Sequence, residues 1–95
     1  MKPVISAAAI PRSRRVIGIF LPSTEIEIPD SEREQIAQVY QGREWRALAR
    51  GTKGSWHAVA GAPSEVAAIE AAREACSQAE RECRLYAVGN FRVGD

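Results

Sequence analysis

A chain of 95 residues supplies about one domain, and because much of its 45% hydrophobic fraction is alanine, we expect a thin core with few large anchors. The formal net charge of +1 excludes a whole-molecule field that would steer nucleic acid or an anionic membrane toward the protein. No apolar run approaches the roughly 20 residues that cross a bilayer, so we expect no membrane span.

Positive charge is concentrated near the start of the chain, at Arg12, Arg14 and Arg15. The apolar stretch before them is interrupted by proline and is too short for a secretory signal. We expect residues 1–14 to be a flexible basic leader and residues 15–95 to be a single domain. The arginines could contact phosphates, but no aromatic platform interleaves with them, so we do not favour nucleic acid as a partner.

Two strands are the first predicted elements. Residues 16–21 (VIGIFL) are rich in β-branched and aromatic side chains, which predicts a buried strand that ends at Pro22. Residues 24–28 alternate isoleucine with glutamate. This alternation predicts a short edge strand, which Pro29 would end.

A short helix is predicted next, over residues 31–41. Ser31 and Glu34 form a capping box, in which each side chain can accept from the other residue's free backbone amide. An apolar stripe at helical spacing follows, and Gly42 supplies a stop. The stripe consists of Ile36, Val39 and Tyr40.

A β-hairpin is predicted from two similar segments, WRALA from Trp45 and WHAVA from Trp56, which flank the sequence GTKG. A loop of four or of two residues within GTKG gives the same register. In that register Trp45 lies opposite Ala60 and Trp56 lies opposite Ala49. Both indoles would then be largely buried on one face, against the helix that follows.

An alanine-rich helix begins at Ser64, which is a good N-cap and is followed by Glu65 in the first turn. Its small side chains would let it lie close to the sheet. The alternating run over residues 85–93 then predicts a closing strand. The expected buried stripe of the helix is Val66, Ile69, Ala72, Cys76 and Ala79.

These elements predict an α+β fold, with a mostly antiparallel sheet of four or five strands and two helices in the order β-β-α-β-β-α-β. The segments WHAVAGAPSEVAAIEAAREAC and CRLYAVGNF resemble a group of uncharacterised, usually exported bacterial domains. The resemblance covers residues 44–92. It implies a hairpin, an alanine-rich helix and a cysteine pair leading into a strand, and it implies no catalytic residues.

Cys76 and Cys83 are the two cysteines of the chain. On an unbroken helix they would lie about 10 Å apart, beyond the Cα separation of about 7 Å that a disulfide can span. A bridge therefore requires the helix to end near residues 78–81, where the chain must in any case turn back to the sheet. We favour a structural disulfide over two buried free thiols and over a metal or redox role, since C-x6-C is not a zinc spacing.

His57 is the sole histidine and could act as a base beside a cysteine. Strand alternation places it opposite Trp56 and away from the helix that carries Cys76, so we expect a half-exposed strand residue. The sequence contains no glycine-rich phosphate loop, paired-carboxylate site or nucleophile elbow. We therefore expect no catalytic, cofactor-binding or metal-binding residues.

A candidate interaction patch lies on the other face of the hairpin, where Leu48 and Val59 would join Tyr86 and Val88 of the final strand. One helix covers one face of a sheet, so either the first half of the chain covers this patch, which we favour, or it is a self-association or recognition surface. We expect a non-catalytic accessory or protein-interaction domain of the bacterial cell envelope, periplasmic or exported rather than cytoplasmic. The alternative is a small nucleic-acid-associated or regulatory protein that uses its basic amino-terminal segment.

Overall fold

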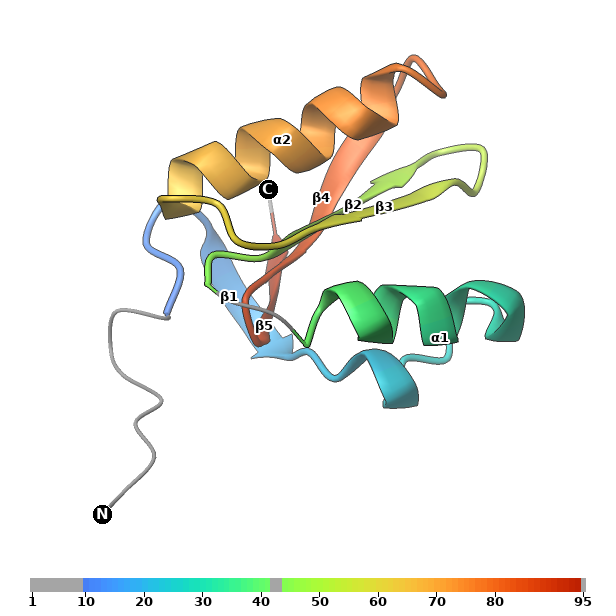
Figure 1. Ribbon diagram of the computed structural model, residues 1–95, viewed down its shortest axis with the longest axis horizontal. Helices are drawn as coiled ribbons and strands as arrows, with labels where there is room; N and C mark the ends of the chain where they lie inside the picture. Colours follow the sequence, from blue (N-terminus) through green and yellow to red (C-terminus); the bar gives the residue numbers. More distant parts are fainter. Residues whose placement is uncertain (1–9, 42–43, 95) are drawn as a thin grey trace.

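The computed structural model describes residues 10–41 and 44–94. Two helices pack on opposite faces of one antiparallel sheet, whose strand order is β1-β5-β4-β2-β3 (Figure 1). The predicted α+β class, sheet type and two helices are confirmed. The elements are β1 (Arg15–Ile19), the 3-10 helix η2 (Pro22–Thr24), α1 (Asp30–Val39), β2 (Ala47–Gly51), β3 (Trp56–Val59), α2 (Glu65–Ser77), β4 (Cys83–Val88) and β5 (Phe91–Gly94).

Helix α2 covers one face of the sheet through small side chains, as predicted. Its first turn is capped by Ser64, whose Oγ accepts from the amide of Ala67 at 3.1 Å. Val66, which we expected in the buried stripe, is 53% exposed, and Ala79 lies beyond the end of the helix and is also exposed. The core on this face consists of Ala47, Ala49, Ala68, Ile69, Ala72, Cys76, Leu85, Val88 and Val93.

The first half of the chain covers the other face. Phe20 packs edge-to-face on Tyr40 and Tyr86, with ring centroids 5.1 and 5.9 Å apart, and Trp56 packs in the same way on Tyr86 at 5.1 Å. Edge-to-face packing is the arrangement that aromatic quadrupoles favour. The core on this face consists of Phe20, Ile28, Ile36, Tyr40, Leu48, Tyr86 and Ala87.

The predicted strand over residues 24–28 is wrong. Residues 22–24 form η2 with Pro22 at its start, and a turn follows in which Ile26 is 90% exposed and Ile28 is buried. The isoleucines therefore do not share one face, because the chain bends between them. The sheet nevertheless has five strands, because the segment predicted as one closing strand forms two, β4 and β5. They form a hairpin that turns at Gly89-Asn90, where Gly89 has a φ of 59°.

Helix α1 begins one residue earlier than predicted. Pro29 occupies the N-cap position, and its carbonyl accepts from the amides of Glu32 and Arg33 at 2.9 and 3.0 Å. Asp30 pairs with Arg33 at 2.7 Å in the first turn, and no side-chain cap bond forms there, so the Ser31 capping box is wrong. The helix ends at Val39, and the predicted stop at Gly42 lies outside the described residues.

The hairpin of β2 and β3 is confirmed, but its register is one residue from the prediction: Leu48 pairs with Ala58, and Arg50 pairs with Trp56. The reason is a three-residue loop, in which the Gly51 amide donates to the Ser55 carbonyl at 2.8 Å and Gly54 has a φ of 102°. A left-handed third residue is typical of such loops.

This shift of one residue changes the face on which Trp56 lies. Trp56 packs with Tyr86 on the α1 side, whereas Trp45 packs on the α2 side and is bonded to Ala62 rather than opposite Ala60. Both indoles are half-buried, so the prediction of two largely buried tryptophans on one face is wrong. By the same alternation His57 is half-exposed, as expected, but lies on the α2 side of the sheet.

Candidate interaction surface

The four residues of the predicted patch do not form one surface. Leu48 and Tyr86 belong to the core under α1, whereas Val88 belongs to the core under α2 and Val59 packs against it. A register shift in the pairing of β2 with β4 lies at Tyr86, so Tyr86 and Ala87 both contact the α1 side and strand alternation is broken there. Leu48 and Tyr86 are buried beneath residues of the first half of the chain, which therefore covers the face under α1, as we favoured.

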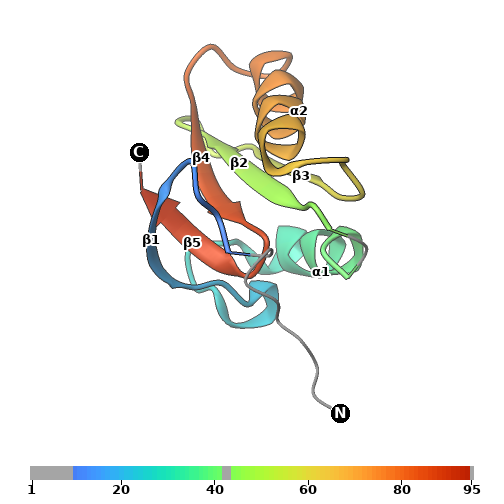
Figure 2. The ribbon, with the colours of Figure 1, turned by 90° about the vertical axis from the view of Figure 1, so that its left-hand side faces the viewer.

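Exposed aliphatic side chains instead gather along β1, which forms an outer edge of the sheet beside β5 (Figure 2). Ile17 is 52% exposed and Ile19 is 63% exposed, whereas the sequence predicted a buried strand. We call this surface the β1 strip. It consists of Val16, Ile17, Ile19, Leu21 and, in the turn beyond, Ile26.

The outer side of β1 also carries unpaired backbone groups. The Phe20 amide donates to the Asn90 carbonyl at 2.9 Å, and Gly18 pairs with Arg92 of β5. Because antiparallel strands bond through alternate residues, the amide and carbonyl of Ile19 point to the free side, whereas a bulge between Val16 and Gly18 breaks the alternation at Ile17. Among the described residues, no strand lies beside β1 on that side. Backbone and side chains together make this edge a template for another strand.

The predicted basic contacts separate in the structure. Arg14 and Arg15 line an open hollow of about 370 Å³ together with Arg73 of α2. Arg12 does not line this hollow. The backbone amides of Arg12 and Ser13 donate to the Glu65 carboxylate at 3.0 and 2.8 Å. The end of the expected leader therefore contacts the start of α2 at these residues, and residues 1–9 lie outside the described residues.

The contact with the leader lowers the pKa of Glu65. Burial acts to raise the pKa of Glu65, but the hydrogen bonds from Ser13 and Arg12 outweigh it and leave the pKa below its usual value. The carboxylate therefore stays charged at neutral pH, beside a helix N-terminus that favours negative charge.

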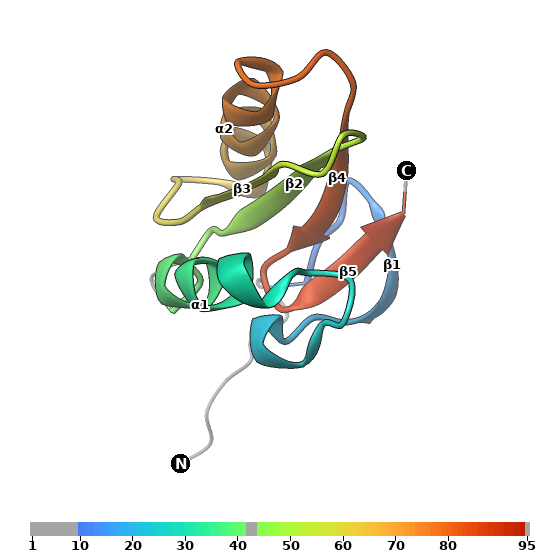
Figure 3. The ribbon, with the colours of Figure 1, turned by 90° about the vertical axis from the view of Figure 1, so that its right-hand side faces the viewer.

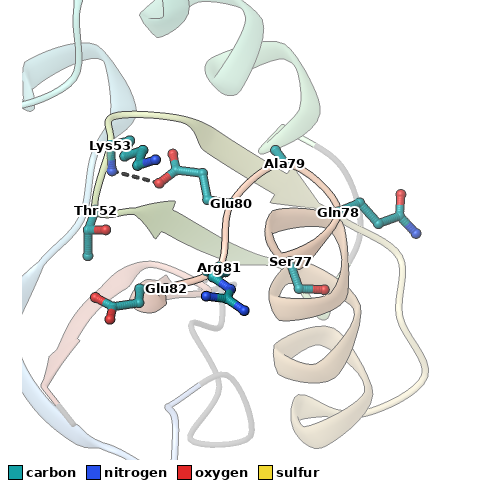
Figure 4. Close-up of a pocket in the computed structure, with 8 residues that line it drawn as sticks. All are labelled: Thr52, Lys53, Ser77, Gln78, Ala79, Glu80, Arg81 and Glu82. Carbon is teal, nitrogen blue, oxygen red and sulfur yellow. Dashed lines mark hydrogen bonds between the residues drawn. The ribbon is translucent and has the colours of Figure 1, made fainter.

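The predicted disulfide is confirmed. Cys76 and Cys83 are bonded, with sulfurs 2.01 Å and Cα atoms 6.1 Å apart. The reversal it requires is also present, because α2 ends at Ser77 and β4 starts at Cys83. The chain between them passes beside the tip of the β2–β3 hairpin, where an open polar hollow of about 600 Å³ lies (Figure 4).

Glu80 in this loop anchors the hairpin tip. Its carboxylate accepts from the amides of Lys53 and Ser55, at 2.6 and 2.9 Å, and from the Ser55 hydroxyl at 2.5 Å (Figure 4 shows the Lys53 bond). The Ser55 hydrogen bond, ahead of the others, lowers the pKa of Glu80. Gly51 belongs to the same contact, because a Cβ there would overlap the Glu80 carboxylate.

His57 joins this contact, with Nε2 3.0 Å from Ser55 Oγ. In a hydrolase triad the histidine accepts the serine proton and the acid holds the histidine. Here the Ser55 hydroxyl donates to the Glu80 carboxylate and not to His57. The two oxygens of Glu80 also accept from the amides of Lys53 and Ser55, so these hydrogen bonds stabilise the turn at the hairpin tip. Glu80 was missed from the sequence because its partners lie 25 and 27 residues away.

The described residues hold neither a cluster of metal ligands nor a helix that could cross a membrane. No group of three or more histidine, cysteine, aspartate or glutamate side chains is placed to hold a metal ion within residues 10–41 and 44–94. In the same residues, neither helix has the length and apolar character that crossing a bilayer requires. A third view of the fold shows α1 and α2 on opposite sides of the sheet, with β1 at its edge beside β5 (Figure 3).

Comparison with known proteins returned no relative. No protein-family model matches the chain, and no curated protein or solved structure matches it. The resemblance of residues 44–92 to exported bacterial domains therefore stays a prediction.

Proposed function

We propose that this protein is a non-catalytic protein-interaction domain that binds its partner along the free edge of β1. The observation that carries the proposal is the β1 strip, where exposed aliphatic side chains flank the unpaired backbone groups of Ile19. A partner strand added there would satisfy these groups and bury the isoleucines, as in recognition by β-strand addition.

The composition of the edge supports this proposal. Proteins protect free edges with charged residues, proline or a covering segment, because an open apolar edge leads to association. From Val16 to Leu21 the chain carries neither a charge nor a proline, and the protection that β1 has is limited to Arg15 at its start and a bulge between Val16 and Gly18. Scattered exposed apolar residues need no explanation, but three within the five residues of one edge strand, Val16, Ile17 and Ile19, favour an interaction site.

Site-specific photo-crosslinking in the native cell tests the proposal. A photoreactive residue in place of Ile19 should give a covalent protein adduct. The matched control is Val66, which is similarly exposed at 53% but lies on α2 at a distance from β1. An adduct from position 19 and none from position 66 supports the proposal, and no adduct from position 19 contradicts it.

We further propose that the domain works in the bacterial envelope, in the periplasm or outside the cell. The Cys76–Cys83 bridge supports this location, because disulfides persist in oxidising compartments and are rare in the cytosol. Alkylation of whole cells quenched in acid should leave both cysteines unmodified until reductant is added. Two modified thiols before reduction would contradict an exported location.

The second candidate function is association with nucleic acid, favoured by the position of Arg73 beside Arg14 and Arg15. Phosphate contacts release counterions, so such binding must weaken as salt rises. Titration of a fluorescent duplex at several salt concentrations, with the wild type and Arg73→Gln, tests it. Binding whose salt dependence becomes shallower in the variant would support this candidate, and no binding at low salt would remove it.

A further inference from the structure

We propose that the partner strand at the β1 edge carries acidic side chains at the end that meets the start of β1, where their carboxylates bind the arginines beside that edge. The inference rests on the proposed function of the β1 strip and names the chemistry of its occupant. We call the open hollow of about 370 Å³ at the start of β1 the arginine hollow. It is lined by Ser13, Arg14, Arg15, Arg73 and Gly94.

The arginine hollow and the β1 strip form one continuous surface. Arg15 is the first residue of β1, lines the hollow and pairs with Gly94 of β5. A Cβ on Gly94 would lie 3.6 Å from Cγ2 of Ile17 and 3.7 Å from Nη2 of Arg15. The aliphatic side chain of Ile17 and the guanidinium of Arg15 therefore both lie against Gly94. A segment that covers the strip reaches the arginines without leaving this surface.

The positive charge of the arginine hollow is not neutralised by an ion pair within the described residues. The ion pairs of residues 10–41 and 44–94 are those of Arg33, Arg46 and Arg50, and none involves an arginine of the hollow. The Glu65 carboxylate feels Arg14, but its hydrogen bonds go to the end of the leader. Guanidinium groups bind carboxylates through paired N–H donors. Three of them around one hollow therefore favour a ligand that carries carboxylates.

The aliphatic neighbour of the hollow favours a peptide over a nucleic acid. A nucleic acid would bring phosphates to the arginines and would leave Ile17 and Ile19 against its charged backbone. A partner strand bonds the free backbone groups of Ile19, covers both isoleucines and presents its carboxylates to the hollow. An apolar centre with a charged rim is also the usual arrangement of a protein interface, and charge complementarity at the rim selects the partner.

Strand geometry predicts where the acids lie in the partner sequence. A strand rises about 3.3 Å per residue, so Arg15 and Ile19 lie about 13 Å apart along the edge. An added strand spans this distance in about four residues, and the bulge between Val16 and Gly18 changes that number by about one. We therefore expect aspartate or glutamate within about six residues of the partner residue that a photoreactive group at position 19 captures.

Photo-crosslinking from position 19 in two charge-matched backgrounds tests the inference. Arg14→Gln/Arg73→Gln removes charge from the arginine hollow, and the control Arg81→Gln/Arg84→Gln removes the same charge from exposed arginines that do not line it. Each purified chain, checked for folding by circular dichroism, is added at limiting concentration to an extract of the native cell. The yield of the adduct should fall about fivefold or more in the hollow variant, because two ion pairs with the partner are lost. The control should match the wild type.

Mass spectrometry of the adduct gives the second readout and separates the inference from the proposed function. A captured protein segment with acids at the expected spacing, together with a lower yield in the hollow variant alone, supports the inference. A protein segment without such acids, or equal yields in both variants, overturns the inference and leaves the interaction domain intact. An adduct that nuclease digests, or no adduct from the wild type, overturns both.

Discussion

Reduction of the Cys76–Cys83 bridge should destabilise the domain by an amount that follows from its loop length. The bridged residues are seven apart in sequence. The chain-entropy relation for a loop of this size gives about 2.4 kcal/mol at 25 °C. For a domain of this length, that free energy corresponds to a decrease in Tm of roughly 10 °C or more.

The reduced protein should also lose order at the hairpin tip. Glu80 lies within the loop that the bridge closes, so its hold on the amides of Lys53 and Ser55 depends on the loop keeping its shape. These two amides should exchange with solvent faster after reduction, while amides in the middle of β2 change less. The contact runs through Glu80, whose amide donates to the Cys76 carbonyl at 2.9 Å.

The assay is thermal unfolding with and without reductant, followed by circular dichroism. The matched control is the double variant Cys76→Ala/Cys83→Ala, since alanine leaves no unpaired hydroxyl at Cys76, which is fully buried. Reductant should lower the Tm of the wild type and leave the control unchanged. An equal shift in both proteins, or none in the wild type, would refute the reasoning.

Three further predictions concern side chains inside the fold. Tyr86→Phe removes a 2.6 Å hydrogen bond to Glu25 and should cost about 1–2 kcal/mol of unfolding free energy in urea. Tyr40→Phe is its control: among the described residues the buried Tyr40 hydroxyl has no partner, so its removal should be neutral or stabilising, and an equal loss in both variants would contradict this account. Gly51→Ala should force the Glu80 carboxylate off the hairpin tip and speed exchange of the Ser55 amide, whereas Gly18→Ala, where a Cβ has open space, should not. Because its pKa is lowered in the fold, Glu80 contributes stability that is complete above the ordinary carboxylate pKa and is lost as pH falls through the lower folded value. Glu80→Gln should therefore flatten the acid limb of a plot of unfolding free energy against pH, and an unchanged limb would exclude the anchor.

Elements determined by neighbouring residues were predictable from the sequence. The cap at Ser64 involves a partner three residues away, and the alanine-rich helix follows from its own periodicity. The disulfide was predictable because the chain had to reverse between the two cysteines. The class of the fold follows from these elements together.

Features that depend on one extra residue or on distant partners were not predictable. Loops of two, three and four residues fit GTKG equally well, and the three-residue loop moved Trp56 to the other face. The irregularity at Tyr86 likewise broke an alternation that the sequence continues without interruption. The alternating isoleucines of residues 24–28 match a strand, yet proline-bounded turns place Ile26 in solvent.

The β1 strip was mispredicted for a different reason. An aliphatic run such as VIGIF indicates that the segment becomes covered, but it does not say what covers it. Within this chain the cover is absent among the described residues, and Ile17 and Ile19 stay exposed. On our account the run is a buried strand after all, and the neighbour that buries it is another chain.

Hydrogen exchange at the Ile19 amide, measured by NMR without and with the partner that the crosslink from position 19 captures, tests this account most directly. This amide points away from β5, so a strand added at the free edge can bond it. We predict that its protection rises when the partner is added, while the Phe20 amide, already bonded to Asn90, stays protected throughout. Fast exchange at Ile19 in the presence of saturating partner would contradict the central claim.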